Sequence, residues 1–235
     1  TSRGVDGVLL IPARESCAAG AGAALREDVE RVTCPVVLID RLTQCGWCDA
    51  VGFDNYLGGR LAAQYLLEGG HKRIGIVTGD VAESSAADRR RGFVDAIEQA
   101  EERFDSALCV SGDYRFDGGY HAADRIIDGG ATAVFCCNDV MALGFRQRMA
   151  ERGLHVTEDM QVIGYDNILR RFGLGLRMTT VEQSVVDLAA AGWGMLGSRI
   201  DAVVRGDGDS GAGRPWLASP QVKVLTPKLV QAACA

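Results

Sequence analysis

Short apolar runs alternate with longer helical patterns along this chain, and that alternation is the feature that most restricts its fold. VDGVLLI (5–11), CPVVLID (34–40) and RIGIVTG (73–79) have the length and apolar content of buried strands. The segments between such runs carry apolar residues three or four positions apart, which is the spacing of a helix packed on one side. Strands that alternate with helices form parallel sheets covered on both faces, so the sequence predicts an α/β fold.

The same pattern predicts the remaining elements. Further strands are expected at 49–55, 106–112, 132–137, 160–166 and 221–227. Helices are expected around 18–32, 57–66, 93–97, 120–127, 139–152 and 185–196. Gly69-Gly70 and Gly153 stop two of them, because glycine ends helices readily. The residues after 166 and the stretch GDGDSGAGRP (206–215) are predicted to be loops.

Composition bounds the class of protein. The 235 residues are enough for one large or two small domains, and 47% hydrophobic with 24% charged residues is typical of a globular chain. The sequence has no apolar stretch of about 20 residues and no signal-peptide pattern at its start, so we expect a cytoplasmic protein without a membrane partner. A net charge of −6 argues against nucleic-acid binding by these residues alone.

Eight cysteines are present, and most are scattered through apolar runs where a reduced thiol acts as a small hydrophobic group. The pair Cys45-Gly-Trp-Cys48 is different, since C-x-x-C is a redox motif or half of a zinc site. A zinc site needs two more ligands at suitable spacing, and a redox pair needs a helix start after a strand. The pair lies between two predicted strands, which favours a loop with incidental thiols and predicts neither a metal nor a cofactor.

Polar side chains follow directly on several predicted strands. In AVFCCNDVMALG (133–144) an apolar run gives way to Asn138 and Asp139, and Asp40 and Asp166 close two other runs. Ligands of open α/β sheets bind outside the carboxyl ends of the strands, so these side chains are candidates for a binding site. The alternative for Asn138 is a helix N-cap. We detect no helix after Asp40 or Asp166 for which capping would serve.

Arginines and aromatic residues complete the candidate set. Arg89-Arg90-Arg91 is expected in the first helical turn after the 73–79 strand, where cations oppose the helix dipole, so at least one should have a partner or a ligand. The alternative is a solvated charged turn. Guanidinium, carboxylate and amide groups together can hold vicinal hydroxyls, and Tyr114 or Phe172 could cover the apolar face of a sugar ring.

The sequence resembles the effector-binding domain of the lactose-repressor/galactose-repressor (LacI/GalR) family of transcription regulators. The matching stretches are CPVVLIDR (34–41), VGFDNYLGGRLAAQYLLEGGHKRIGIVTG (51–79), RRRGFVDAI (89–97), VFCCNDVMALGFRQRMAERGL (134–154), VIGYDN (162–167) and TTVEQ (179–183). The resemblance implies the fold of periplasmic sugar-binding proteins, with two doubly wound parallel-sheet subdomains and a ligand cleft between them. Residues 1–56 would be the remnant of a truncated N-subdomain, 57–183 the C-subdomain, and 184–235 a helix, loop and strand that cross back.

Carried over position by position, the family's ligand-binding arginine, asparagine and aspartate fall on Arg89, Asn138 and Asp166. Its stacking aromatic falls on Tyr114, in a GDY stretch, and Asp40 and Gln183 occupy secondary positions in the cleft. The resemblance therefore implies that Asn138 binds the ligand, while Asp139 supports the start of its helix. The effector would be a sugar, a polyol or a nucleoside.

The sequence also departs from the family pattern. No helix-turn-helix headpiece matches within these residues, and the chain opens at what resembles the family's third strand. Operator DNA would then be bound only through that missing headpiece. A sheet without two of its strands would leave an edge near 5–11 exposed, which predicts a homodimer or higher self-association.

Two other function classes remain open. A sugar-binding transport receptor would share the fold, and a signal sequence upstream would favour it over a regulator. An enzyme is less well supported, because the glycine-rich stretches fit no nucleotide-binding pattern and His71, His121 and His155 lie far apart in sequence. We therefore expect a binding domain rather than a catalyst.

Overall fold

A computed structural model describes residues 4–12, 22–42, 46–171, 178–206 and 219–232. The chain forms two compact units. Unit 1 comprises Thr1–Asp54 and Ser184–Leu225, and unit 2 comprises Asn55–Gln183 and Thr226–Ala235. The parallel α/β architecture predicted from the alternating pattern is confirmed in both.

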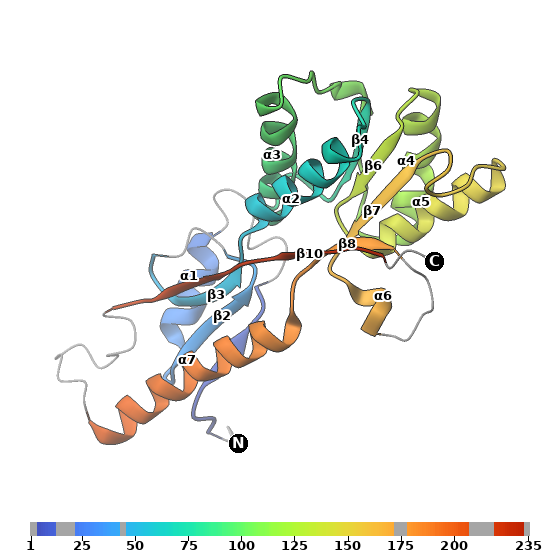
Figure 1. The fold of residues 1–235 in the computed structure, drawn as a ribbon. Coiled ribbons are helices and arrows are strands. Elements are labelled where there is room, and N and C mark those ends of the chain that lie inside the picture. The colour runs from blue at the N-terminus through green and yellow to red at the C-terminus, as the bar shows by residue number, and fades with distance from the viewer. Residues whose placement is uncertain (1–3, 13–21, 43–45, 172–177, 207–218, 233–235) are drawn as a thin grey trace. The chain divides into compact units, whose positions relative to one another are not determined.

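Unit 1 is built on a four-stranded parallel sheet in the order β1-β2-β3-β9. Its strands are β1 (Val8–Leu10), β2 (Val36–Asp40), β3 (Asp49–Phe53) and β9 (Val222–Leu225), and its helices are α1 (Gly22–Arg31) and α7 (Val185–Arg205). Within this unit the sheet and both helices can be followed in Figure 1.

The two faces of this sheet are covered by different helices. Val36 and Leu38 of β2 pack in one buried cluster with Leu25 of α1, while Val37 packs in another with Leu188 of α7. Because side chains alternate across a strand, consecutive residues of β2 serve opposite cores. The continuous apolar run in the sequence is therefore the pattern of a strand buried on both sides.

A buried ion pair fixes α7 to the start of β3. Asp49 is only 2% exposed, and its two carboxylate oxygens accept from Nε and Nη2 of Arg199 at 2.7 and 2.9 Å. The backbone N–H of Gln221 donates to the same carboxylate at 2.7 Å. A two-point contact of this kind holds α7 in one register against β3. The partners are 150 positions apart, so no local sequence pattern predicts the pair.

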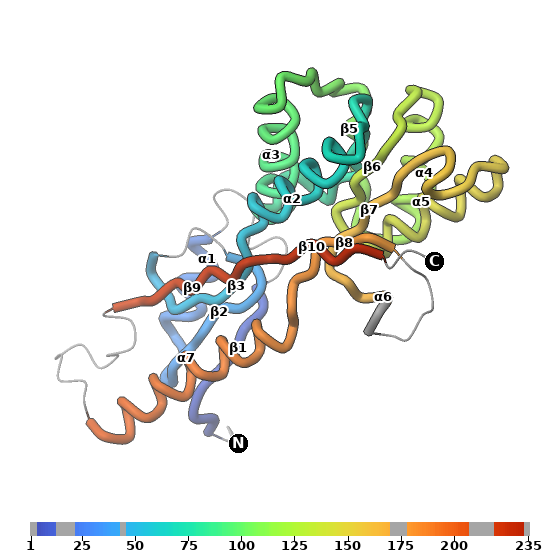
Figure 2. The backbone as a smooth tube through the Cα atoms, viewed as in Figure 1, coloured from blue at the N-terminus to red at the C-terminus, as the bar shows by residue number. Residues whose placement is uncertain are grey.

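Unit 2 is built on a six-stranded sheet in the order β10-β8-β7-β6-β4-β5. Its strands are β4 (Ile74–Thr78), β5 (Cys109–Ser111), β6 (Ala133–Cys136), β7 (Gln161–Tyr165), β8 (Thr179–Glu182) and β10 (Lys228–Val230). All neighbours are parallel except β10, which runs antiparallel beside β8, as the tube in Figure 2 traces.

Helices cover both faces of the second sheet. Helices α2 (Asn55–Glu68) and α3 (Ser84–Gln99) lie on one side, and α4 (Phe116–Asp128) and α5 (Asp139–Glu151) on the other (Figure 1). Two shorter segments, a 3-10 helix η2 (Ser106–Leu108) and the helix α6 (Ile168–Arg171), link strands at the sheet ends. The resulting core centres on Phe93, Phe135 and Tyr165, all fully buried.

Glycines let the helices of each pair approach closely. A Cβ on Gly59 of α2 would lie 2.0 Å from the carbonyl oxygen of Arg89, and one on Gly92 of α3 would lie 2.0 Å from that of Tyr56. On the other face, Gly144 of α5 similarly meets the carbonyl oxygen of Phe116 at 2.0 Å. Each of these neighbours is backbone, so it cannot move aside as a side-chain tip could.

Three local predictions need correction. The residues after 166 do not remain a loop, because α6 begins at Ile168. The strand predicted at 221–227 is confirmed as β9, but it is not the last strand, because β10 follows from Lys228 in unit 2. The run 106–112 opens as a 3-10 helix, because Asp105 accepts a hydrogen bond from the backbone N–H of Ala107. Most of the predicted 206–215 loop lies outside the described residues.

No helix in the described ranges combines the length and apolar character needed to cross a bilayer.

Replacing Gly144 by alanine should lower the free energy of unfolding by about 1–3 kcal/mol, since the new methyl group must push α4 and α5 apart. Gly194→Ala on exposed α7, where nothing lies within 4 Å, is the control and should stabilise by about 0.5–1 kcal/mol. Urea denaturation followed by circular dichroism measures both changes. Equal effects of the two substitutions would contradict the close approach at Gly144.

Candidate functional site

Arg89 lies at the centre of a buried polar cluster in unit 2. The sequence predicted Arg89 in the first turn of its helix. Helix α3 begins at Ser84, so Arg89 is in the second turn. The helix dipole, which acts within the first turn, therefore does not disfavour the charge of Arg89, and its partners come from tertiary packing. The residue is buried, with 7% of its surface exposed.

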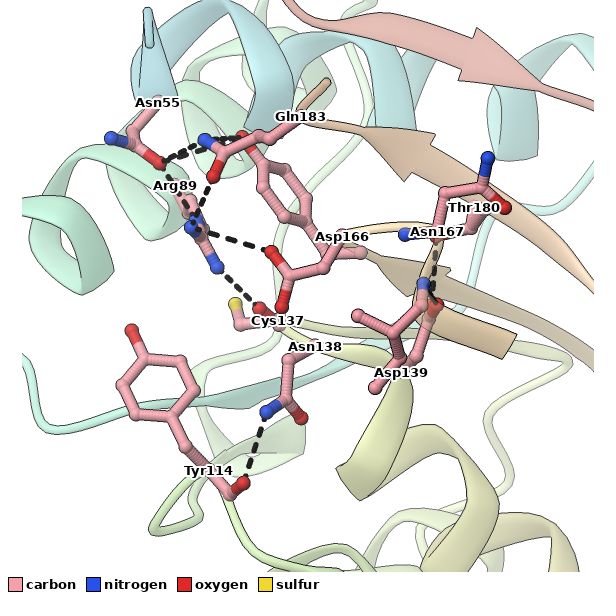
Figure 3. Close-up of polar contacts among 12 residues, drawn as sticks. Asn55, Arg89, Tyr114, Cys137, Asn138, Asp139, Asp166, Asn167, Thr180 and Gln183 are labelled. Atoms are coloured by element: carbon pink, nitrogen blue, oxygen red, sulfur yellow. Dashed lines mark hydrogen bonds and ion pairs between the residues drawn. The ribbon is translucent and has the colours of Figure 1, made fainter. Parts of the chain in front are cut away.

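Three hydrogen bonds hold the guanidinium group of Arg89 (Figure 3). Its Nε donates to Oδ1 of Asn55 at 2.8 Å, and its Nη1 donates to the backbone carbonyl of Cys137 at 2.6 Å. Its Nη2 makes a longer bond of 3.4 Å to Oε1 of Gln183. A guanidinium has five N–H groups, so two remain after these bonds to the described residues.

The surroundings of Arg89 are mostly uncharged. All three acceptors are neutral, and the guanidinium carbon lies 3.7 Å from the centre of the Tyr165 ring, a cation–π contact. The nearest carboxylate, Oδ1 of Asp166, is 3.9 Å from Nη2, which is beyond hydrogen-bond distance. Burial acts to lower the pKa of Arg89, but Tyr165 and Asp166 raise it above the ordinary arginine value. The group stays charged.

Asn55 collects several donors on one oxygen. Besides Arg89, the amide nitrogen of Gln183 donates to Oδ1 of Asn55 at 3.1 Å, and the hydroxyl of Tyr165 approaches it at 3.4 Å. Gln183 also donates to the Tyr165 hydroxyl at 3.1 Å. Sequence reasoning missed Asn55 and Tyr165. Asn55 could have been found by the strand-end rule that selected Asp166, because it follows β3 by two residues.

Asn138 is a helix N-cap. Its Oδ1 accepts from the backbone N–H of Met141 at 2.8 Å, and its Nδ2 donates to the carbonyl of Tyr114 at 3.0 Å. The capping alternative thus describes its present bonds, and one amide hydrogen remains for another partner. Asp139 lies in the first turn of α5, where a carboxylate interacts favourably with the helix dipole, as predicted. Its carboxylate also accepts hydrogen bonds from Ile168 and Thr180, which were not predicted.

Tyr114 lies across the end of β4. A Cβ on Gly79 would come within 2.0 Å of its ring, so only glycine leaves room for the tyrosine there. The backbone of Tyr114 has φ 62°, a left-handed conformation uncommon outside glycine. Burial raises the pKa of its hydroxyl to about 12, against the lowering effect of nearby Arg89.

Asp166 and Asn167 also have left-handed backbones, with φ 94° and 54°. The backbone N–H of Asp166 donates to Val181 on β8 at 2.8 Å, and its carboxylate is turned toward Arg89 in Figure 3. About a third of the Asp166 side chain is exposed, whereas Arg89 is buried behind it. Contrary to expectation a helix does follow, but Asp166 is two residues ahead of its first residue, Ile168.

The remaining predicted site residues have different outcomes. Gln183 belongs to the Arg89 cluster, as described. Asp40 lies in unit 1, at the end of β2, with a left-handed φ of 72°. Phe172 falls outside the described residues. The structure therefore brings Arg89, Asp166 and Gln183 together, with Asn138 and Tyr114 nearby in the same unit (Figure 3).

The cysteines of this region are not reactive groups. Cys136 and Cys137 are fully buried, and burial raises the pKa of Cys137 to about 12, so the thiol stays protonated. Cys48 of the C-x-x-C pair is buried and donates to the carbonyl of Val36, while Cys45 lies outside the described residues. Within the described ranges, no group of three His, Cys, Asp or Glu side chains is arranged to hold a metal ion.

Both a family model and individual repressor sequences match this chain. Residues 63–223 match the family described as periplasmic binding protein-like domain. The HTH-type transcriptional repressor PurR of Pasteurella multocida is 35% identical over 199 residues, covering 84% of this chain and 58% of the repressor. The PurR of Haemophilus influenzae is 36% identical over 170 residues, covering 72% of this chain and 50% of the repressor. The chain thus spans about half the length of these relatives.

Solved structures agree with this match. The transcriptional regulator CelR in complex with cellobiose superposes with a TM-score of 0.80 at 27% identity, covering 97% of this chain and 65% of that one. A LacI family regulator of Enterococcus faecium with bound ribose gives a TM-score of 0.79 at 26% identity, covering 98% and 79%.

Replacing Asn55 by alanine should lower the free energy of unfolding by about 2–3 kcal/mol, because a buried guanidinium loses its Nε acceptor. Asn55→Asp is the matched control, since it keeps an acceptor oxygen at the same place. The aspartate variant should lose much less stability in urea denaturation. Equal losses for the two variants would mean that Asn55 does not hold Arg89.

Proposed function

We propose, from the premise that this chain belongs to the periplasmic binding protein-like effector domains of LacI-family transcriptional regulators, that unit 2 binds a small hydroxylated effector at Arg89 and Asp166. The observation that supports this most is the geometry of those two side chains. They face each other at 3.9 Å without a hydrogen bond, with Arg89 buried and Asp166 about one-third exposed.

The chemistry of the pair suits a diol. Arg89 retains two N–H donors among the described residues, and the Asp166 carboxylate is an acceptor. A hydroxyl group both donates and accepts, so one hydroxyl can take a bond from Arg89 and give one to Asp166. A neighbouring hydroxyl then reaches Asn138, which keeps one amide hydrogen beyond its capping bonds.

The effector class that we favour is a sugar or a nucleoside. Cellobiose and ribose are bound in two structurally similar regulators, and the sequence relatives are HTH-type transcriptional repressors. Ribose occurs both as a free sugar and as the sugar part of ribonucleosides. Tyr114 supplies an aromatic face near the site, and Asp40 of unit 1 and Phe172 stay predicted contributors.

Binding would act as a switch rather than as catalysis. A ligand that binds one arrangement of the two units more tightly than another shifts the population toward it. In the intact regulator, that shift would change operator DNA binding through a separate headpiece. We expect the protein to act in the cytoplasm.

Asp166→Asn should weaken effector binding by more than about tenfold or abolish it. The substitution removes the negative charge of the acceptor group and keeps the fold. The measurement is a thermal-shift screen of ribose, cellobiose and inosine, in which a ligand at 100 Kd stabilises by about 2.7 kcal/mol. Asp201→Asn, an exposed carboxylate on α7, is the control for charge. Arg89→Ala would be a poorer test, because it also removes the donor to Oδ1 of buried Asn55 and to the carbonyl of Cys137.

An unchanged response of Asp166→Asn to a ligand that stabilises the wild-type protein would move the effector site elsewhere.

We also propose that the chain self-associates through unit 1. Strand β1 pairs only with β2 among the described strands, and exposed apolar side chains lie on α7, with Val186 at 73%, Trp193 at 67% and Val204 at 80%. These three residues fall on one stripe of the helix, because they are spaced at seven and eleven positions. An unpaired sheet edge and an apolar stripe are both features that a second copy could cover.

Trp193→Glu should shift the protein toward monomer in sedimentation velocity at high concentration, since a charge would then enter the apolar stripe. Val81→Glu in unit 2, a half-exposed apolar position, is the control and should leave the association unchanged. A wild-type protein that stays monomeric at high concentration would refute the proposal.

A further inference from the structure

Asp166 and Asn167 both have a left-handed backbone conformation, which neighbouring groups must stabilise. Both are non-glycine residues with positive φ, 94° and 54°, in direct succession. Such residues persist only where the surrounding structure holds them, and this pair sets the direction of the carboxylate that faces Arg89. The question is which side chain supplies the support.

The supporting group is the carboxylate of Asp139, which is fully buried. Its Oδ2 accepts from the backbone N–H of Ile168 at 2.8 Å, at the residue that follows the strained pair. Its Oδ1 accepts from the hydroxyl of Thr180 at 2.7 Å. The same hydroxyl oxygen accepts from the backbone N–H of Asn167 at 3.4 Å, so Asp139 reaches the pair by two routes (Figure 3).

The neighbouring backbone leaves room for this carboxylate. A Cβ on Gly164 of β7 would come within 2.2 Å of Oδ1 of Asp139, so a larger residue there would displace it. The side chain of Asn167 is held separately, by a hydrogen bond of 2.9 Å from its Nδ2 to Glu182. The strained pair is therefore fixed from α5, through Asp139, and from β8, through Thr180 and Glu182.

We propose that Asp139 is a positioning residue of the effector site: its bonds to Ile168 and Thr180 hold the left-handed backbone of Asp166 and Asn167 and so aim Asp166 at Arg89. Asp139 does not itself contact the effector. The role in binding rests on the proposed function, whereas the role in holding the backbone does not, and the two can be tested apart.

The protonation of Asp139 provides a direct signal. Burial raises its pKa to about 6, against the lowering effect of the Thr180 and Ile168 hydrogen bonds. The titratable side chains that interact with it are Asp166, at the end of β7, and Cys136, on β6. Ile168 and Leu169 of α6 and Thr180 of β8 do not titrate in this range. A midpoint near pH 6 at Ile168 would thus report on Asp139.

The first experiment uses the ligand-free protein and amide NMR. In the wild-type protein, the Ile168 amide signal should shift with a midpoint near pH 6, and its hydrogen exchange should be slow. Asp139→Asn should remove the pH-dependent shift but keep slow exchange, because an amide oxygen still accepts. Asp139→Ala should lose the protection of Ile168 and displace the signals of Asp166 and Asn167.

Thr180→Val is the second variant, in case Asp139→Ala fails to fold. It keeps the shape of the threonine side chain and removes only the hydroxyl, so Asn167 should shift while Ile168 stays protected. Unchanged Asp166, Asn167 and Ile168 signals in folded Asp139→Ala, or an unchanged Asn167 signal in Thr180→Val, would overturn the proposal.

The second experiment measures binding of ribose, cellobiose and inosine by calorimetry. For any probe that binds the wild-type protein, Asp139→Ala should weaken the affinity about tenfold, the effect of one lost charge-assisted hydrogen bond, and Asp139→Asn should restore most of it. Equal affinity of Asp139→Ala and wild type would overturn the role in binding. If no probe binds the wild-type protein, the proposed function fails with these ligands, while the NMR result still decides the role of Asp139 in the backbone.

Discussion

A buried positive charge organises the second unit of this protein. Arg89 is held by two amide side chains and a backbone carbonyl, and it lies on the ring of Tyr165. Burying a guanidinium is costly unless its donors are satisfied, so each of these groups is constrained in turn. Asn55 is the first residue of helix α2, and Cys137 directly follows β6, so the Arg89 bonds connect the ends of two elements. Among the described residues, three of its five N–H groups have acceptors, and the proposed function assigns the other two to the effector.

Left-handed backbone recurs at the strand ends where binding residues were predicted. Asp40, Tyr114 and Asp166 all have φ between 62° and 94°, and Asn167 has 54°. For residues other than glycine this conformation must be enforced by neighbours. Asp139 is such a neighbour, through its hydrogen bond to Ile168. Gly79 and Gly164 leave the space that Tyr114 and Asp139 occupy.

The sequence predicted the fold more reliably than the details of the site. The apolar runs located nearly every strand, because a strand buried on both faces leaves a signal in consecutive residues. The strand-end rule drew attention to Asn138 and Asp166, and the opposition of a cation to the helix dipole drew attention to Arg89. Capping of its own helix by Asn138 was one of the two interpretations of the sequence. No local pattern predicted that Asp139 bonds a different helix, or that Asn55 and Tyr165 join the cluster. Those contacts join residues up to 128 positions apart, as with Asn55 and Gln183.

What the sequence determined by itself was periodicity: which segments are strands, which are helices, and which polar side chains stand where one gives way to the other. These properties depend on residues a few positions apart, so a local pattern encodes them. Only the tertiary structure decided which partner each polar group has, as with the Asp139 carboxylate, which bonds the first residue of α6. It also decided that β9 belongs to unit 1 and β10 to unit 2. These contacts form where packing brings a buried donor and a buried acceptor within about 3 Å of each other. The sequence around either residue does not contain that distance.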